Sequence, residues 1–365
     1  SDASYKIIII AMAIITAIYV ILGGYAATAI NDFVQGIVML LGIIAVVVCA
    51  VSSQGGFSHA LKQLGEIEYQ GMTDQYNSIL GPDPINLIGV IILTSLGTWG
   101  LPQMVHKFYA VKDEAAIKKG TIISTLFAFI VAGGSYFLGG FDRLFCTVQG
   151  ESGKTFIRTL PNGSPEYDAM IPAVLKSALP ELLIGLVVVL VLSASMSTLS
   201  SLVLTSSSTL TIDFIKPKMK KQDERKEVII MRALIAAFLI ISVIIAFNKT
   251  ASISTLMSYS WGALAGAFLG PFLYGLYSKK ITKPAVWTSF IVGIGLTMAH
   301  MFLFGFDWFP ELRKAAASFP LNLASPINAG AIVMILSLIL VPLVSLFTKP
   351  SNEKEVEEVF SCYQS

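Results

Sequence analysis

The stretch SASMSTLSSLVLTSSSTLTID, residues 193–213, continues an apolar run that begins at Glu181. The length of that run predicts a helix at membrane depth. Yet twelve of the nineteen residues from Ser193 to Thr211 carry a hydroxyl group. On an α-helix, six small or hydroxyl-bearing residues of this stretch share one face: Ala194, Ser197, Thr198, Ser201, Thr205 and Ser208.

This face has two interpretations. Hydroxyl and carbonyl oxygens on one side of a helix are the ligands that a small, hard cation needs when it loses its water inside a membrane. Small residues also let helix backbones approach closely, and serine hydroxyls can bond to carbonyls of their own helix. The pattern therefore indicates either a cation site or a packing face, and both stay open at this point.

The composition places the rest of the chain in a bilayer as well. Of its 365 residues, 55% are hydrophobic and only 13% are charged, and the mean hydropathy is +0.74. A soluble domain carries roughly 25% charged residues. We therefore predict an all-α polytopic protein whose main partner is the lipid bilayer. The net charge of +2 is spread over loops between apolar runs, so no basic face for nucleic acid is expected.

A helix needs about 20 apolar residues to cross the hydrocarbon core. The chain offers nine candidate spans, and no strand pattern is visible between them. Gly23-Gly24 is expected to end the first span, and Asn31 or Asp32 to cap the second. The nine spans are Tyr5–Leu22, Asp32–Val51, Pro84–Tyr109, Ala115–Leu138, Glu181–Phe214, Val228–Phe247, Ile253–Tyr277, Pro284–Phe304 and Pro326–Phe347.

The basic residues predict the orientation in the membrane. Loops 101–120, 215–232 and 278–283, together with the tail after Phe347, hold 16 of the 25 Lys and Arg residues. Because short cytoplasmic loops carry the excess of positive charge, this set is expected to face the cytoplasm. The chain is then a multi-pass protein of the plasma or inner membrane, with its N-terminus outside and its C-terminus in the cytoplasm. The segment KPKMKKQDERK (216–226) is the strongest indication of a cytoplasmic loop. The alternative interpretation, a solvated run of charges, is compatible with that location.

Nothing in the sequence indicates an enzyme. The three cysteines and three histidines are scattered, so no metal centre, disulfide framework or catalytic triad is predicted. No carboxylate pair lies inside a span, and GESGKT (150–155) lacks the first glycine and the preceding strand of a phosphate-binding loop. We expect no organic cofactor. The scattered cysteines and histidines are Cys49, Cys146, Cys362, His59, His106 and His300.

One apolar span is interrupted by GTWGLPQ, residues 97–103. Pro102 lacks an amide hydrogen and disfavours helix just before itself, and the two glycines let the chain unwind. Backbone freed at membrane depth must line a cavity or be buried in protein, and interrupted spans often mark a transporter's binding site. Thr98, Trp99 and Gln103 would offer a hydroxyl, a stacking face and an amide to a small polar solute. A proline kink without a ligand is the alternative.

Two further positions break the apolar pattern. Gly262, Gly266 and Gly270 recur at a spacing of four, which indicates a tight packing face. Tyr259 and Trp261 beside them are interpreted as interfacial anchors rather than ligand contacts. Asp32 is either an N-cap or a carboxylate at the mouth of an ion path.

Four motifs taken together resemble the sodium/solute symporter family, which includes sodium/proline, sodium/pantothenate and sodium/sugar symporters. The resemblance extends over essentially the whole chain, and the hydroxyl-rich segment is its most specific part. The motifs are GGYAATAINDFVQGIVMLLG (23–42), GTWGLPQMVHKFYAVKDEAAIKKG (97–120), LSASMSTLSSLVLTSSSTLTIDF (192–214) and WGALAGAFLGPFLYGLYSKKITKPA (261–285).

The resemblance implies a leucine-transporter-type core of two inverted five-helix repeats within a single transporter domain. Residues 1–51 would be the last two helices of the first repeat, and residues 84–277 would be the second repeat. Residues 284–347 would add two helices, and 348–365 would be a cytoplasmic tail. The first core helices would be absent, so the chain is expected to be N-terminally truncated and to need those helices to complete its site.

The function implied by the resemblance is sodium-coupled symport of a small organic solute by alternating access. The solute would be an amino acid such as proline, or a carboxylate. Na⁺ would be the co-transported ion. Proton coupling, or a membrane sensor built on a transporter scaffold, are the alternatives.

The family's binding residues map onto this chain by position. Sodium would bind the Ala194 carbonyl, Ser197 and Thr198. A second sodium would bind Ser200, Ser201 and Asp32. The solute would contact Thr98, Trp99, Pro102 and Gln103, with Tyr259 and Trp261 as gate or packing residues. Thr98 stands where proline symporters are expected to carry an aromatic residue, which puts proline itself in question.

Overall fold

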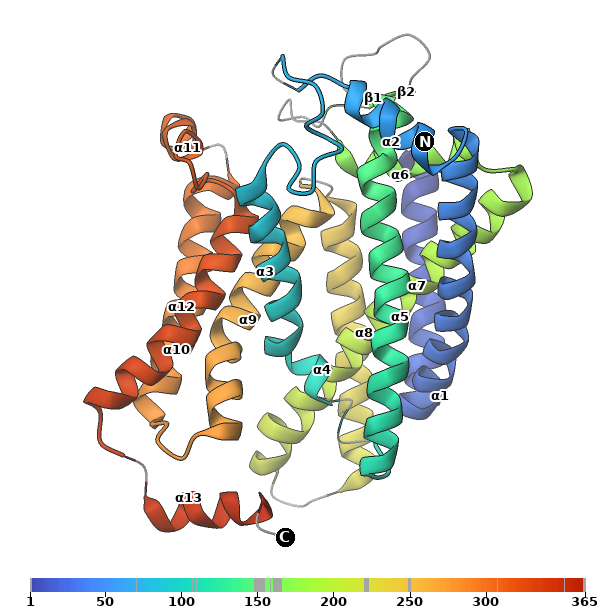
Figure 1. The fold of residues 1–365 in the computed structure, drawn as a ribbon. Coiled ribbons are helices and arrows are strands. Elements are labelled where there is room, and N and C mark those ends of the chain that lie inside the picture. The colour runs from blue at the N-terminus through green and yellow to red at the C-terminus, as the bar shows by residue number, and fades with distance from the viewer. Residues whose placement is uncertain are drawn as a thin grey trace. The chain divides into compact units, whose positions relative to one another are not determined.

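The computed structural model describes residues 2–69, 71–106, 108, 111–147, 155–157, 159, 166–219, 223–248, 251–306, 308–350 and 352–363. These residues are mostly helical (Figure 1), as predicted. One exception was not predicted: β1 (Cys146–Thr147) and β2 (Thr155–Phe156) form a short parallel pair. Tyr69 and Met72 add an isolated antiparallel bridge.

The chain divides into two compact units, each made of segments distant in sequence. The first contains residues 1–77 and 111–250, and the second contains residues 78–110 and 251–365. The helices of the first unit are α1 (Asp2–Ser53), α2 (Phe57–Glu66), α5 (Glu114–Phe141), η2 (Asp142–Leu144), η3 (Tyr167–Ala169), α6 (Met170–Ala178), α7 (Glu181–Thr209), η4 (Leu210–Ile215), η5 (Lys216–Lys218) and α8 (Glu224–Phe247).

The second unit begins with a short helix pair and continues after a long interval. Its helices are α3 (Pro84–Gly100), α4 (Pro102–His106), α9 (Ile253–Tyr277), α10 (Lys283–His300), η6 (Met301–Gly305), α11 (Pro310–Ala317), α12 (Pro326–Phe347), α13 (Glu353–Phe360) and η7 (Ser361–Tyr363). The hydroxyl-rich stretch therefore lies in the first unit, and the interrupted span lies in the second.

Within the described residues, six helices are long and apolar enough to cross a membrane. The predicted number of spans, nine, exceeds this number for three reasons. The first two predicted spans are joined in α1, α3 has only 17 residues, and α9 is long enough but less apolar. The six are Ser4–Ser53, Glu114–Leu144, Glu181–Lys218, Glu224–Phe247, Lys283–Gly305 and Pro326–Phe347.

Helix α1 folds back on itself at a single residue (Figure 1). Gly24 has φ 56° and ψ −152°, and it is the one non-helical residue inside α1. Glycine reaches this backbone region without the steric cost that a Cβ imposes. The first arm thus ends where predicted, but the second arm is helical well before Asp32. The prediction that Asn31 or Asp32 caps the second span is wrong, because helix already surrounds both residues.

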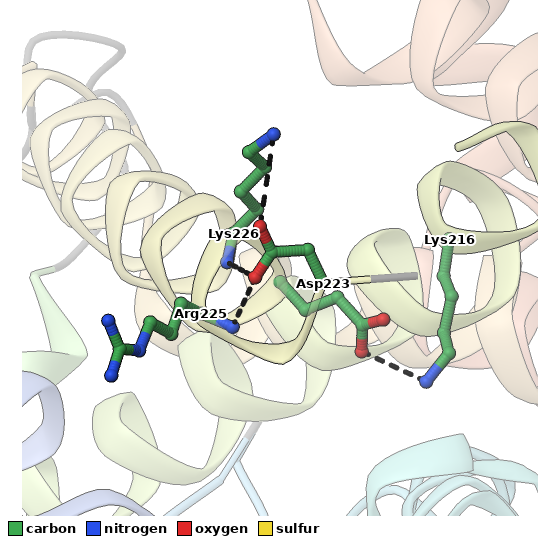
Figure 2. A network of polar contacts seen from close by, with 5 residues as sticks. Lys216, Asp223, Arg225 and Lys226 are labelled. Carbon is green, nitrogen blue, oxygen red and sulfur yellow. Dashed lines mark hydrogen bonds and ion pairs between the residues drawn. The ribbon is translucent and has the colours of Figure 1, made fainter. Parts of the chain in front are cut away.

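Charged residues fix the ends of the connection between α7 and α8 (Figure 2). Lys216 Nζ lies 2.9 Å from Glu227 Oε2. The Asp223 carboxylate accepts the backbone N–H groups of Arg225 and Lys226, which caps the first turn of α8. Part of the basic segment 216–226 thus serves to begin a helix.

The glycines of α9 let the helices of the second unit approach closely. A Cβ at Gly262 would lie 3.1 Å from the Cα of Gly330 on α12, and Gly266 faces Val333. From α10, Gly293 meets the backbone of Gly266 and Ala267. The spacing of four therefore marks a packing face, as the sequence indicated.

A buried serine pair compensates for the proline inside α9. Pro271 has no amide hydrogen, so the carbonyl of Ala267 loses its helical partner. Ser289 from α10 lies 3.0 Å from that carbonyl oxygen and donates to it. Ser337 from α12 lies 2.9 Å from the Ser289 hydroxyl and accepts the N–H of Gly270. Three helices are joined at the kink with its polar groups paired.

Gly293→Ala should destabilise the second unit, because its Cβ would lie 2.5–2.6 Å from backbone atoms of Gly266 and Ala267. Overpacking of this kind costs roughly 1–3 kcal/mol. Gly295→Ala on the same helix is the control, because a Cβ there meets nothing within 4 Å, and alanine is the better helix former. Thermal unfolding in detergent should show a lower midpoint for the first variant only. Equal midpoints would contradict this packing.

Candidate functional site

The hydroxyl-rich stretch forms one continuous helix and its π-helical extension. Helix α7 runs to Thr209 and passes into the π-helix η4. π-Helices are rare in proteins, but those that occur are often at functional sites. Ala194, Ser197 and Ser201 are half-buried, Thr198 is more exposed, and Ser200 is completely buried. All of the residues predicted to bind sodium on α7 thus lie in a regular helix of the first unit.

Hydrogen bonds within α7 engage several of these hydroxyls. Thr198 Oγ1 donates to the Ala194 carbonyl at 3.1 Å, and Ser200 Oγ donates to the Ser197 carbonyl at 2.9 Å. A hydroxyl that donates keeps its oxygen lone pairs, and a carbonyl oxygen has two. Within the helix the Ala194 carbonyl accepts both the N–H and the hydroxyl of Thr198, so its two lone pairs are used. The Thr198 hydroxyl oxygen beside it keeps lone pairs that can accept a cation.

The first arm of α1 and α8 hold α7 from one side. The Tyr19 hydroxyl donates to the Met196 carbonyl at 3.0 Å. Val20 packs with Val203 and with Ile235 of α8. Met196 and Val203 lie on the side of α7 opposite to Ala194, Ser197 and Ser201. The Met196 and Val203 contacts thus hold α7 on the side away from Ala194, Ser197 and Ser201.

The second arm of α1 contacts the other side of α7. Gly42 faces Leu190, and further along Val46 packs in one cluster with Val187. Because residue numbers rise on one helix as they fall on the other, the two run antiparallel. Asp32, ten residues before Gly42, is therefore at the height of Ser200, ten residues after Leu190. Asp32 itself is half-buried.

The interrupted span is broken where the sequence predicted. Helix α3 ends at Gly100, Leu101 is extended with φ −88° and ψ 116°, and α4 begins at Pro102. Proline imposes this extended conformation on the residue before it and is well suited to a first helical position. A Cβ at Gly100 would lie 2.8 Å from the Cα of Ala265 on α9. The glycine thus permits close packing at the helix end.

The predicted solute-binding side chains surround this break within the second unit. Thr98 Oγ1 donates to the Ser95 carbonyl of its own helix at 2.9 Å. Trp99 is 60% exposed, while Pro102 and Gln103 are half-buried. Trp99 and Gln103 therefore present polar and aromatic groups that the rest of the second unit does not enclose.

Tyr259 and Trp261 lie on α9 in different surroundings. Trp261 packs in a cluster with Leu93 and Met334, and a Cβ at Gly97 would lie 2.9 Å from its ring. The Tyr259 ring centroid lies 5.7 Å from that of His300. Trp261 thus belongs to the interior of the second unit, which an interfacial anchor would not.

One buried polar residue near the hydroxyl face received no role in the sequence analysis. Gln35 on the second arm is 8% exposed, although glutamine is usually a surface residue. The signal was available, because Thr28, Gln35 and Gly42 recur every seven residues and share one helix face.

The profile of the Sodium:solute symporter family matches residues 2–293. The chain belongs to the sodium:solute symporter family. This is a family of transporters, not of enzymes, and the chain is a multi-pass integral membrane protein.

Relatives with curated names are symporters and transporters. A sodium/pantothenate symporter of Haemophilus influenzae is 27% identical over 83% of this chain and 60% of its own length. The osmoregulated proline transporter OpuE of Bacillus subtilis is 25% identical over 80% of this chain and 56% of its own length. A sodium/proline symporter of Staphylococcus aureus is 25% identical over 79% and 54%. The chain thus spans a little over half the length of these relatives.

A solved structure shares the fold. A Na⁺-coupled sialic acid symporter in its substrate-bound outward-open state superposes with a TM-score of 0.63, over 95% of this chain and 68% of the symporter. The sequence identity is 16%, so the likeness concerns the fold alone.

Tyr19→Phe should loosen the attachment of α7 to α1. The variant removes the hydrogen bond to the Met196 carbonyl, which is worth about 1 kcal/mol. Thermal unfolding of the purified chain in detergent should show a lower midpoint. Tyr25→Phe, at an exposed position on the same helix, should leave the midpoint unchanged, and equal effects of the two substitutions would contradict this role.

Proposed function

We propose that this chain is part of a sodium-coupled symporter that moves a small organic solute by alternating access. One observation carries the proposal. The Ala194 carbonyl and the Thr198 hydroxyl are adjacent oxygens that share a helix face with Ser197. Neutral oxygens of this kind, at membrane depth, suit a small hard cation. Membership of the sodium:solute symporter family supports the same conclusion.

The ion would drive transport through the electrochemical gradient. One charge crossing the membrane contributes about 2.3 kcal/mol per 100 mV, and the concentration ratio adds to this. Sodium affects the protein only to the extent that its affinity differs between two conformations. Here that difference would come from oxygens brought toward Ser197 and Thr198 in one conformation and moved away in the other.

The solute would bind beside the break between α3 and α4. The exposed Trp99 ring and the half-buried Gln103 amide offer a stacking face and hydrogen bonds to a small polar molecule. An amino acid such as proline, or a carboxylate, fits this chemistry. The names of the relatives, proline and pantothenate symporters, are compatible with either.

The proposal includes the architecture implied by the resemblance. Two inverted five-helix repeats, completed by helices upstream of residue 1, would form the transporter core. The likeness in fold to a sialic acid symporter supports this arrangement. The distribution of Lys and Arg favours an outer N-terminus and a cytoplasmic C-terminus.

Ser197→Ala and Thr198→Ala should each raise the sodium concentration required for half-maximal uptake by about tenfold, since a lost ligand worth about 1.4 kcal/mol has that effect. Radiolabelled solute uptake, measured with the upstream sequence restored, provides the test. Thr198→Ser retains the hydroxyl and should stay close to the wild type. Unchanged sodium dependence in both alanine variants would refute the assignment of these ligands.

Replacing sodium by choline at fixed pH should abolish solute uptake, because choline is too large for a site made by two turns of a helix. Uptake that persists in choline and instead follows an imposed pH gradient would show proton coupling. A screen of amino acids and carboxylates under the sodium condition would identify the solute.

A further inference from the structure

Gln35 is a buried amide without a hydrogen-bond partner for its oxygen. The residue is 8% exposed, and Oε1 contacts no donor among the residues that the structure describes. Burying an amide without a compensating hydrogen bond is unfavourable, because the group loses its hydrogen bonds to water. A ligand that bonds to the Gln35 amide oxygen would remove this unfavourable contribution.

The helix geometry gives the direction of this side chain. Gln35 lies seven residues before Gly42, almost two full turns, so both residues share one face of the second arm. Gly42 faces Leu190 of α7. The neighbouring face, which carries Gly36 and Ile43, contacts α5 instead. Gln35 therefore belongs to the side of α1 that packs on α7.

The antiparallel register gives its height. Seven residues back from Gly42 and seven residues forward from Leu190 cover the same axial rise, about 10 Å. This places Gln35 level with Ser197. On α7, Ser197 and Ser201 share the face of Leu190, so the buried amide and the hydroxyl face are turned toward each other.

An amide oxygen and serine and threonine oxygens are the same class of hard, neutral ligand. A hydroxyl can satisfy Oε1 by donating, but neither Ser197 nor Ser201 on the facing side of α7 donates to it. A small cation satisfies the amide oxygen and the hydroxyl oxygens together, because all of them offer lone pairs.

We propose that Oε1 of Gln35 is a ligand of the monovalent cation bound at the hydroxyl face of α7, so that the ion joins the second arm of α1 to α7. The inference rests on the proposed function, since it presupposes a cation at Ser197 and Thr198. It adds a ligand from a second helix of the same unit, which the hydroxyl face alone does not supply.

The test uses the complete 365-residue chain in lipid nanodiscs. Its unfolding temperature is measured as NaCl replaces choline chloride at constant ionic strength. A ligand that binds the folded state raises this temperature according to its concentration and affinity. The wild type should show a saturable rise. Gln35→Leu should raise the half-saturating sodium concentration at least tenfold.

The same variant distinguishes a ligand from a structural amide. In choline, Gln35→Leu should be as stable as the wild type or more stable, because it removes an unsatisfied buried polar group. Gln35→Glu, which keeps an oxygen at this position and adds charge, should preserve the sodium response. Gln54→Leu, the same change in the turn after α1, is the matched control and should behave as the wild type.

Each outcome decides the matter. A wild-type sodium response that Gln35→Leu retains with the same half-saturating concentration overturns the inference and leaves the proposed function standing. A large loss of stability in choline, with an unchanged sodium increment, shows a structural amide or a bound water and also overturns it. Absence of any sodium response in the wild type overturns this inference, which requires α1 and α7 of this chain to hold the ion, while the uptake assay with the upstream sequence restored tests the proposed function separately.

Discussion

The absence of water from the hydrocarbon core is the constraint on which this structure depends. A polar atom there must find its partner within the protein, or in a ligand. The kink in α9 shows the first solution, since Ser289 satisfies the carbonyl that Pro271 deprives of its partner. The serines of α7 show it too, through bonds to carbonyls of their own helix. The Gln35 oxygen departs from this pattern, as do the buried hydroxyls of Thr16 and Thr211.

Much of the local structure followed from residues with a single strong physical effect. Pro102 fixed the end of α3, and Gly24 fixed the reversal of α1. The spacing of Gly262, Gly266 and Gly270 predicted close helix packing. In each case one residue removes a hydrogen-bond donor or a side chain, so its consequence is local and can be inferred from sequence alone.

The remaining features depend on residues outside the local motif. Asn31 and Asp32 are good capping residues, but the helix around them continues because Gly24 is the only break. Trp261 is a residue type typical of interfacial anchors, yet its ring packs against Gly97 of α3, where a side chain would leave no room for it. Gln35 shares a helix face with Thr28 and Gly42, but only the neighbouring helices show that it is buried. The hydroxyl face was predicted, whereas its relation to the second arm of α1 needed the contact between Gly42 and Leu190.

The reversal of α1 has a consequence for how the chain enters its membrane. The turn contains one non-helical residue, so the two arms of α1 are joined without a hydrophilic loop. The two arms can leave the translocation machinery as a preformed hairpin. A reporter protein inserted at Gly24 for topology mapping would separate the two arms of α1, which otherwise insert together.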